Sequence, residues 1–284
     1  MNILVLGSSG QIGSALCDYY TKKGFGVEEF DVMESDYEDL RIPYNPMLEA
    51  KLDRSDFVFF LAYDIGGSRY LKENQNTFNY VDNNMKIMVN TFNAIKNHNK
   101  PFVFASSQMS NMDWSSYGSL KRVGEHYTKT LGGVVARFWN VYGVEKRDES
   151  RYGVITDFLM KAAKTGKIDM ITDGSETREF LYANDACEAL DTLRLNYNNI
   201  DRDRDLCVTS FEETSILEVA QEVSLLFGAN IVPSTNKDEV QKNSRNVADK
   251  YIREFWKAKT SLKEGIGRVA LAHDLIQPDY ETTK

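Results

Sequence analysis

The stretch Asn2-Ile3-Leu4-Val5-Leu6-Gly7-Ser8-Ser9-Gly10-Gln11-Ile12-Gly13 decides the fold that we expect for this chain. Its apolar first part predicts a short buried strand, and the residues from Ser14 to Lys23 predict a helix. Between them, Gly7 allows a sharp turn, Gly10 lets a pyrophosphate approach the backbone, and Gly13 lets the helix pack close to the sheet. The pattern therefore predicts a dinucleotide site, in a GxxGxxG spacing that loops slightly wider than GxGxxG.

An acidic residue ends the second expected strand, Gly26-Val27-Glu28-Glu29-Phe30-Asp31. A carboxylate at Asp31, roughly 20 residues after the glycine turn, can accept both hydroxyls of an adenosine ribose and repels a 2′-phosphate. No arginine stands beside it, since Val32 and Met33 follow. These residues predict NAD as the cofactor; the alternative is that Asp31 is a solvated acid at a strand end.

The rest of the first half alternates strand patterns with helix patterns. We expect strands over residues 56–62, 101–105 and 133–138, and helices over 79–97 and 117–130. Strands separated by helices predict right-handed crossovers and a parallel sheet, so the fold class is α/β, a Rossmann-type doubly wound sheet. Two pairs further along have the spacing of a capping box at a helix start: Asp185 with Glu188, and Ser215 with Glu218.

We expect this sheet to be joined by a smaller C-terminal substrate domain. The NAD-binding Rossmann domain is predicted to span residues 1–140, with a returning segment near 181–212. The substrate-binding domain is predicted to comprise residues 141–180 and 213–284.

Composition argues against several classes of function. The net charge of −8 disfavours a nucleic-acid partner, and no apolar run approaches the roughly 20 residues of a membrane span. The three histidines form no cluster, so we expect neither a metal site nor a Ser-His-Asp triad. The cysteines, which are odd in number and widely spaced, favour a reducing, cytoplasmic location; they are Cys17, Cys187 and Cys207.

Tyr117 and Lys121 would lie one turn apart on one face of a helix. A nearby ammonium lowers the pKa of a phenol from about 10 towards neutrality, where the phenol can act as acid or base. Tyr117 stands out because its helix follows the strand that ends at Ser106-Ser107, where a serine could hold a substrate hydroxyl; an ordinary strand-end serine is the alternative. The spacing itself is common and recurs in Tyr19/Lys23, Tyr142/Lys146 and Tyr280/Lys284.

Together these residues resemble the extended short-chain dehydrogenase/reductase family, in its NAD-dependent nucleotide-sugar epimerase/dehydratase branch. Two further segments are similar to the family's R-x-x-N-V-Y-G and R-D-F-I-H-V-x-D: residues 137–143 and 178–185. The resemblance runs along nearly the whole chain, because the matching positions occur in the family's order: residues 7–13, Asp31, Leu61-Ala62, Asn84, Asn90, Ser106-Ser107, Tyr117, Lys121 and these two segments.

The resemblance implies a role for each matching residue. The catalytic residues would be Ser107, Tyr117 and Lys121. The cofactor would be held by Gly7, Gly10, Gln11, Ile12, Gly13, Asp31, Leu61, Ala62 and Asn84, together with Tyr117 and Lys121. The substrate, a nucleotide-diphosphate sugar, would lie beside Ser107 and Asn140, and Arg178 would bind its diphosphate. For Arg178 the alternative is a surface pair with Glu176 or Glu179. The family often pairs through the helices that carry Asn84 and Tyr117, so a homodimer is a further expectation.

Three departures from the family pattern bear on the reaction. Only nine residues separate Ser107 from Tyr117, which shortens the pocket wall. Gln108-Met109 stands where 4,6-dehydratases carry an Asp-Glu pair. The segment Tyr63-Asp64-Ile65-Gly66-Gly67 resembles the Gly-Gly loop of GDP-mannose 3,5-epimerase and GDP-fucose synthase. Met109, however, replaces their acid/base cysteine, and a thioether carries no proton.

We therefore expect 4-epimerisation through a transient keto sugar. Tyr117, as phenolate, would remove a proton from the hydroxyl at carbon 4 while the hydride passes to NAD and returns to the opposite face. Lys121 would lower the pKa of Tyr117 and hold the nicotinamide ribose, and Ser107 would orient the hydroxyl. One alternative is a keto-sugar reductase that uses NAD(P)H. The other is a non-catalytic dinucleotide-sensing protein, which should lack the Ser/Tyr/Lys set.

Overall fold

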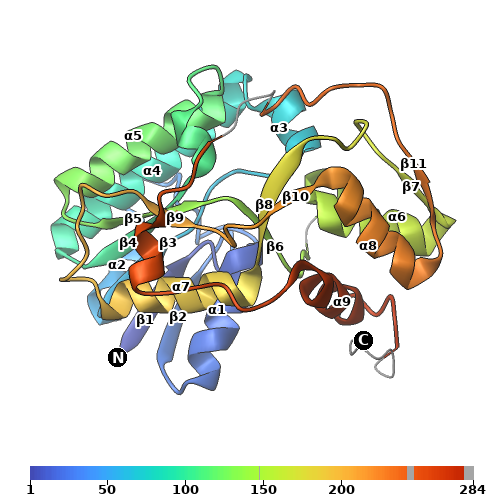
Figure 1. The fold of residues 1–284 in the computed structure, drawn as a ribbon. Coiled ribbons are helices and arrows are strands. Elements are labelled where there is room, and N and C mark those ends of the chain that lie inside the picture. The colour runs from blue at the N-terminus through green and yellow to red at the C-terminus, as the bar shows by residue number, and fades with distance from the viewer. Residues whose placement is uncertain (147, 242–245, 278–284) are drawn as a thin grey trace.

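The computed structural model describes residues 1–146, 148–241 and 246–277. Within these residues, six parallel strands form a central sheet. The sheet order is β2-β1-β3-β4-β5-β9 (Figure 1). The strands are β1 (Asn2–Leu6), β2 (Gly26–Phe30), β3 (Phe57–Phe60), β4 (Phe102–Ser107), β5 (Val134–Phe138) and β9 (Leu206–Val208). The expected α/β class with a Rossmann-type parallel sheet is therefore confirmed.

Helices cover both faces of this sheet, and β1 shows why. Ile3 and Val5 face one apolar cluster, and Leu4 and Leu6 face another, because successive side chains of a strand point to opposite faces. The first cluster is completed by α1 (Gln11–Lys22) and α7 (Ala183–Leu195). The second is completed by α2 (Pro46–Arg54), α3 (Ser68–Asn74), α4 (Phe78–His98) and α5 (Ser116–Thr130). A strand buried on both faces reads as a continuous apolar run, as β1 and β3 do.

The C-terminal part forms a third apolar cluster beside the central sheet, on the right in Figure 1. Three short strands pair in the order β10-β8-β6, and β11 pairs with β7. These strands are β6 (Asn140–Tyr142), β7 (Lys167–Asp169), β8 (Thr177–Tyr182), β10 (Glu213–Ser215) and β11 (Asn230–Val232). The helices of the cluster are α6 (Val154–Thr165), α8 (Ile216–Phe227) and α9 (Leu262–Ala272).

The division into a cofactor domain and a substrate domain stays a proposal. The third cluster favours it, but Tyr251 and Ile252 of the 3-10 helix η3 (Lys250–Glu254) pack in the first cluster, against the central sheet. Residues 242–245 and 278–284, which the expected second domain includes, lie outside the described residues, as does the pair Tyr280/Lys284. Within the described residues, the helices are all too short or too polar to cross a membrane.

One of the two expected capping boxes is present. Ser215 and Glu218 form it at the start of α8. The box expected at Asp185 is wrong: β8 runs straight into α7, whose N-cap is Tyr182, so Asp185 falls in the first turn. Its carboxylate instead accepts backbone N–H bonds from Lys259, at 3.2 Å, and Thr260, at 2.8 Å.

Candidate active site

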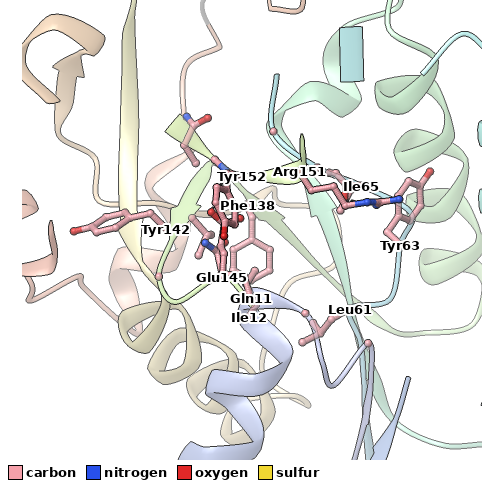
Figure 2. Close-up of a pocket in the computed structure, with 18 of the residues that line it drawn as sticks. Gln11, Ile12, Leu61, Tyr63, Ile65, Phe138, Tyr142, Glu145, Arg151 and Tyr152 are labelled. Carbon is pink, nitrogen blue, oxygen red and sulfur yellow. Dashed lines mark hydrogen bonds between the residues drawn. The ribbon is translucent and has the colours of Figure 1, made fainter. Parts of the chain in front are cut away.

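The carboxyl ends of the parallel strands open into a cleft of about 1870 Å³. Its floor lies at β1 and β3, which are neighbours where the chain order reverses, the position at which open α/β sheets bind ligands. Figure 2 shows Gln11 and Ile12 at the start of α1, beneath Phe138 and Glu145. Thirteen of the predicted site residues line the cleft: Gly7, Gly10, Gln11, Ile12, Gly13, Asp31, Leu61, Ala62, Ser107, Tyr117, Lys121, Asn140 and Arg178.

The glycine turn has the close backbone contacts that its sequence predicts. Gly7 has φ +89°, and a Cβ there would lie 2.7 Å from the backbone of Ala62. A Cβ on Gly13 would lie 2.0 Å from the carbonyl oxygen of Gly7. The helix α1 then starts at Gln11 with no side-chain cap and no acidic residue in its first turn. Its N–H groups and its dipole therefore suit a phosphate group, and the residues fit a dinucleotide.

Asp31 is held at the edge of this turn. Its carboxylate accepts the backbone N–H of Ser9 at 3.1 Å and of Met33 at 2.9 Å. The sequence did not predict that Arg41, in the loop after β2, also lines the cleft. Arg41 is paired through two nitrogens with Asp39, at 2.7 and 2.9 Å, so its charge is already matched.

Two of the expected cofactor residues have structural contacts of their own. Asn84 does not line the cleft: it is fully buried, accepts the N–H of Asp64 at 2.9 Å and donates to the carbonyl oxygens of Asp64 and Tyr80. Gln11, in the amide orientation that satisfies both groups, donates to the oxygen of Val141 and accepts the N–H of Gly143. Asn84 thus fixes the loop after β3, and Gln11 ties α1 to β6.

Ser107, Tyr117 and Lys121 come together at the end of β4 and the start of α5. Ser107 accepts the N–H of Met109 at 3.2 Å, and its hydroxyl favours the ionised form of the Tyr117 phenol. Burial raises the pKa of Tyr117 to about 12, against the lowering effect of Ser107. The expected lowering by Lys121 is not seen, because its Nζ lies 6.0 Å from the centroid of the Tyr117 ring and donates to the oxygen of Ala105 at 2.7 Å.

Lys121 is itself an unusual group, a lysine with almost no exposed surface. Burial lowers its pKa to about 7, and the charge of Glu125 opposes that shift. Its Nζ lies 3.7 Å from the centroid of the Tyr63 ring. Sequence reasoning assigned no role to Tyr63, since nothing in the pattern indicates that the loop after β3 covers this lysine.

Arg178 lies in the wall of the cleft and is paired with Asp238. It also donates to the backbone oxygen of Thr177 at 2.7 Å. The ion pair observed is thus with Asp238, whereas Glu176 accepts from Thr172 and Glu179 from Thr209. Asn140 lies nearby and donates to the backbone oxygen of Glu179 at 3.4 Å.

A polar cluster joins the two sides of the cleft. Arg151, in the 3-10 helix η2 (Glu149–Arg151), donates to Asp64 and to the backbone oxygen of Ile65, both at 3.0 Å. It also donates to the hydroxyl of Tyr70 at 3.0 Å. Figure 2 shows Arg151 extended towards the side where Tyr63 and Ile65 lie. The Gly-Gly loop packs against the same segment, since a Cβ on Gly67 would lie 2.1 Å from the oxygen of Tyr152.

Comparison with known proteins places these observations in a family. The model of the NAD dependent epimerase/dehydratase family matches residues 3–208. The chain belongs to this family. As a member of it the chain is an enzyme of NAD-dependent type, which confirms the expected family and its cofactor.

Curated relatives carry out different reactions. A putative UDP-glucose 4-epimerase from Methanocaldococcus jannaschii is 32% identical over 165 residues, 55% of this chain and 52% of that protein, so the match spans about half of that relative's length. A UDP-N-acetyl-alpha-D-glucosaminuronate decarboxylase from Bacillus cytotoxicus is 26% identical, covering 78% of this chain and 79% of its own. A GDP-mannose 3,5-epimerase from Oryza sativa subsp. indica is 27% identical, covering 94% and 80%.

Several solved structures share the fold of this chain. An epimerase from Methanothermobacter thermautotrophicus has a TM-score of 0.82 at 21% identity, covering 94% of this chain and 90% of its own. The UDP-glucose 4-epimerase of Thermotoga maritima with UDP-glucose has a TM-score of 0.78 at 20% identity, covering 96% and 99%. At this identity the likeness concerns the fold alone. The reaction must be argued from the side chains of the cleft.

Proposed function

We propose that the protein interconverts a nucleotide-diphosphate sugar and its 4-epimer through a transient 4-keto sugar, with NAD as a bound cofactor. The observation that carries this proposal is the meeting of Ser107, Tyr117 and Lys121 in one cleft with the glycine turn. The Ser107 hydroxyl is close enough to Tyr117 to lower the pKa of its phenol, so a substrate hydroxyl beside Ser107 would also lie beside a phenol that can exchange its proton.

Different residues of the cleft would bind the cofactor and transfer the proton. The turn from Gly7 to Gly13 would hold the pyrophosphate, and Asp31 would hold the adenosine ribose. When bound, NAD supplies the acceptor and then the donor of the hydride. Tyr117 would take the proton of the sugar hydroxyl and later return it. Because its pKa is about 12, Tyr117 needs positive charge close by to ionise, and Lys121 would supply this charge on turning from Ala105.

The residues after Ser107 favour 4-epimerisation over other reactions of the family. Met109 is buried in the second apolar cluster, and Gln108 is bonded to Gln241 at 3.1 Å and to Asn246. Neither side chain can exchange a proton. Water elimination and epimerisation at carbons 3 and 5 need an additional acid or base at this point, so both reactions are disfavoured.

The substrate side of the cleft suits a diphosphate. Arg178 presents a planar guanidinium that can bind two phosphate oxygens at once, and Asn140 adds an amide beside it. These contacts support a nucleotide-diphosphate sugar as substrate. A homodimer and a cytoplasmic location remain part of the proposal.

The test begins with the small molecules that the purified protein carries. Mass spectrometry after denaturation should detect NAD or NADH, and a nucleotide sugar if one co-purifies. The protein should then convert a UDP- or GDP-hexose to its 4-epimer without added cofactor. Stoichiometric oxidation of NADPH would favour the keto-sugar reductase. Tight cofactor binding without turnover on any nucleotide sugar would favour the dinucleotide-sensing alternative.

A further inference from the structure

Tyr63 covers the buried ammonium of Lys121. The Lys121 Nζ lies 3.7 Å from the centroid of the Tyr63 ring, within the range of a cation–π contact. The same ring packs edge-on against the Tyr117 ring, with centroids 5.7 Å apart and planes at 75°. In Figure 2 Tyr63 lies at the right-hand side of the cleft, away from Gln11 and Ile12. The loop after β3 thus brings a third aromatic group to the Ser/Tyr/Lys set.

The other groups around Lys121 include a backbone oxygen, a second aromatic ring and a carboxylate that is paired with Arg137. From β4, the oxygen of Ala105 accepts one N–H of Lys121 at 2.7 Å, and the Phe104 ring centroid lies 5.0 Å from Nζ. From α5, Tyr117 and Glu125 face it, but the Glu125 oxygens accept from Ser106 and from two nitrogens of Arg137, each at 2.7 Å. That carboxylate is shared with Arg137, whereas the Ala105 oxygen and the π face of Tyr63 both contact Nζ directly.

We propose that Tyr63 is a positioning residue whose ring stabilises the ammonium form of Lys121 and holds Nζ 6.0 Å from the centroid of the Tyr117 ring. The inference rests on the proposed function in one respect, the role of Lys121 in catalysis. A neutral lysine could not favour the Tyr117 phenolate, so a ring that keeps Lys121 charged would extend activity to higher pH. The loop that carries Tyr63 is fixed independently, because Asn84 binds both backbone groups of Asp64.

The ring and the hydroxyl of Tyr63 can be tested separately. The hydroxyl is buried and has no hydrogen-bond partner among the described residues, so the proposal assigns it no part. Tyr63→Phe keeps the π face and removes the hydroxyl. Tyr63→Leu removes the π face, and Tyr63→Met serves the same purpose with a flexible side chain if the leucine variant does not fold. Tyr37→Leu, at a tyrosine that is 77% exposed, is the matched control.

The experiment measures the titration of Lys121 without turnover. Cofactor-free full-length protein is trace-labelled with acetic anhydride over a series of pH values, and the Lys121 peptide is quantified by mass spectrometry against the exposed Lys129. We expect the titration midpoint of Lys121 to fall by roughly one pKa unit in Tyr63→Leu or Tyr63→Met. It should stay near the wild-type value in Tyr63→Phe and Tyr37→Leu.

Two outcomes would overturn the proposal. An unchanged midpoint in a folded Tyr63→Leu or Tyr63→Met protein means that the ring does not stabilise the ammonium. An equal fall of the Lys121 titration midpoint in Tyr63→Phe would mean that the hydroxyl of Tyr63, and not its ring, stabilises the ammonium. Because labelling needs no substrate, either result is separate from a failure of the proposed reaction, which the turnover assay detects. In active variants, the basic limb of the pH–rate profile should move in the same direction as the midpoint.

Discussion

Tyr117 is the side chain on which the proposed reaction depends most. Tyr117→Phe removes the proton-carrying oxygen and keeps the ring, so we expect turnover to fall by roughly 10²–10⁴-fold. Cofactor affinity should change little, because the glycine turn and Asp31 lie elsewhere in the cleft. Tyr142→Phe is the matched control: Tyr142 has the same spacing to a lysine, but its ring packs in the third apolar cluster. Wild-type turnover in Tyr117→Phe would remove Tyr117 from the mechanism.

Asp31 bears on the choice between NAD and NADP. Its carboxylate would repel a 2′-phosphate, and Arg41, which also lines the cleft, is paired with Asp39. We expect calorimetric titration of cofactor-stripped protein to give tighter binding of NAD(H) than of NADP(H). Asp31→Ser should narrow the difference by roughly tenfold, or about 1.4 kcal/mol. Equal or tighter binding of NADP(H) by the wild-type protein would favour the keto-sugar reductase over the epimerase.

At the scale of elements, a buried ion pair joins α5 to β5 behind the site. Glu125 accepts two hydrogen bonds from Arg137, and both side chains are almost fully buried. Burial tends to raise the pKa of Glu125, but the hydrogen bonds and charge of Arg137 outweigh it, so the pKa lies below its usual value. A carboxylate whose pKa is depressed by folding stabilises the folded state above its unfolded pKa, about 4.3. That contribution is lost as the pH falls below this value.

The prediction concerns stability at two pH values. The free energy of unfolding of the wild-type protein, measured in urea, should be lower at about pH 3 than at about pH 7, because the first value lies below the unfolded pKa of Glu125. Glu125→Gln should be less stable at pH 7, by roughly 3–5 kcal/mol, because it leaves Arg137 buried with one partner removed. It should also lose less stability on acidification than the wild-type protein does. The same pH dependence in both proteins would show that Glu125 does not contribute to the acid sensitivity.

The elements themselves were largely predictable from the sequence. Continuous apolar runs predicted β1, β3 and β4, and the 3.6-residue period predicted α4, because burial on two faces or on one stripe produces these patterns. The prediction of a capping box at Asp185 was wrong for a local reason. Capping spacing does not reveal that a strand runs directly into the helix, as β8 runs into α7.

At the scale of the whole molecule, Arg178 of β8 pairs with Asp238 from a distant segment, and both residues line the cleft. A diphosphate and the Asp238 carboxylate would compete for the same guanidinium. We expect Arg178→Ala to weaken nucleotide-sugar binding by about 10- to 100-fold, since a charged hydrogen bond contributes on the order of 1.5–3 kcal/mol. NAD binding should be spared.

Asp238→Asn is the reciprocal variant. It should bind nucleotide sugar more tightly than the wild-type protein, because the guanidinium loses its internal competitor. Titration of both variants with the same nucleotide sugar measures the two effects. Unchanged affinity in a folded Arg178→Ala protein would leave the diphosphate role without support, and weaker binding in Asp238→Asn would show that the carboxylate orients Arg178 instead.

Contacts between distant segments mark the limit of what this sequence predicted. Those segments of the cleft that carry a local pattern were predicted, as at Gly7–Gly13 and at Tyr117 with Lys121. The aspartate partners of Arg178 and Arg151, and the ring over Lys121, depend on how loops from separate elements meet. The contacts of Asn84 are of the same kind: the resemblance that placed it at the cofactor does not reveal that its amide binds the backbone of Asp64.

The most direct test of the proposed 4-epimerisation follows the hydride that leaves and returns to the same sugar. UDP- and GDP-hexoses labelled with deuterium at carbon 4 are incubated with the purified protein, and the products are analysed by NMR. We predict a 4-epimer that keeps its deuterium at carbon 4, without net consumption of added NADH or NADPH, because the hydride leaves and returns on the same bound cofactor. A product that has lost the deuterium, or that forms only with stoichiometric oxidation of NADPH, would contradict 4-epimerisation by this protein.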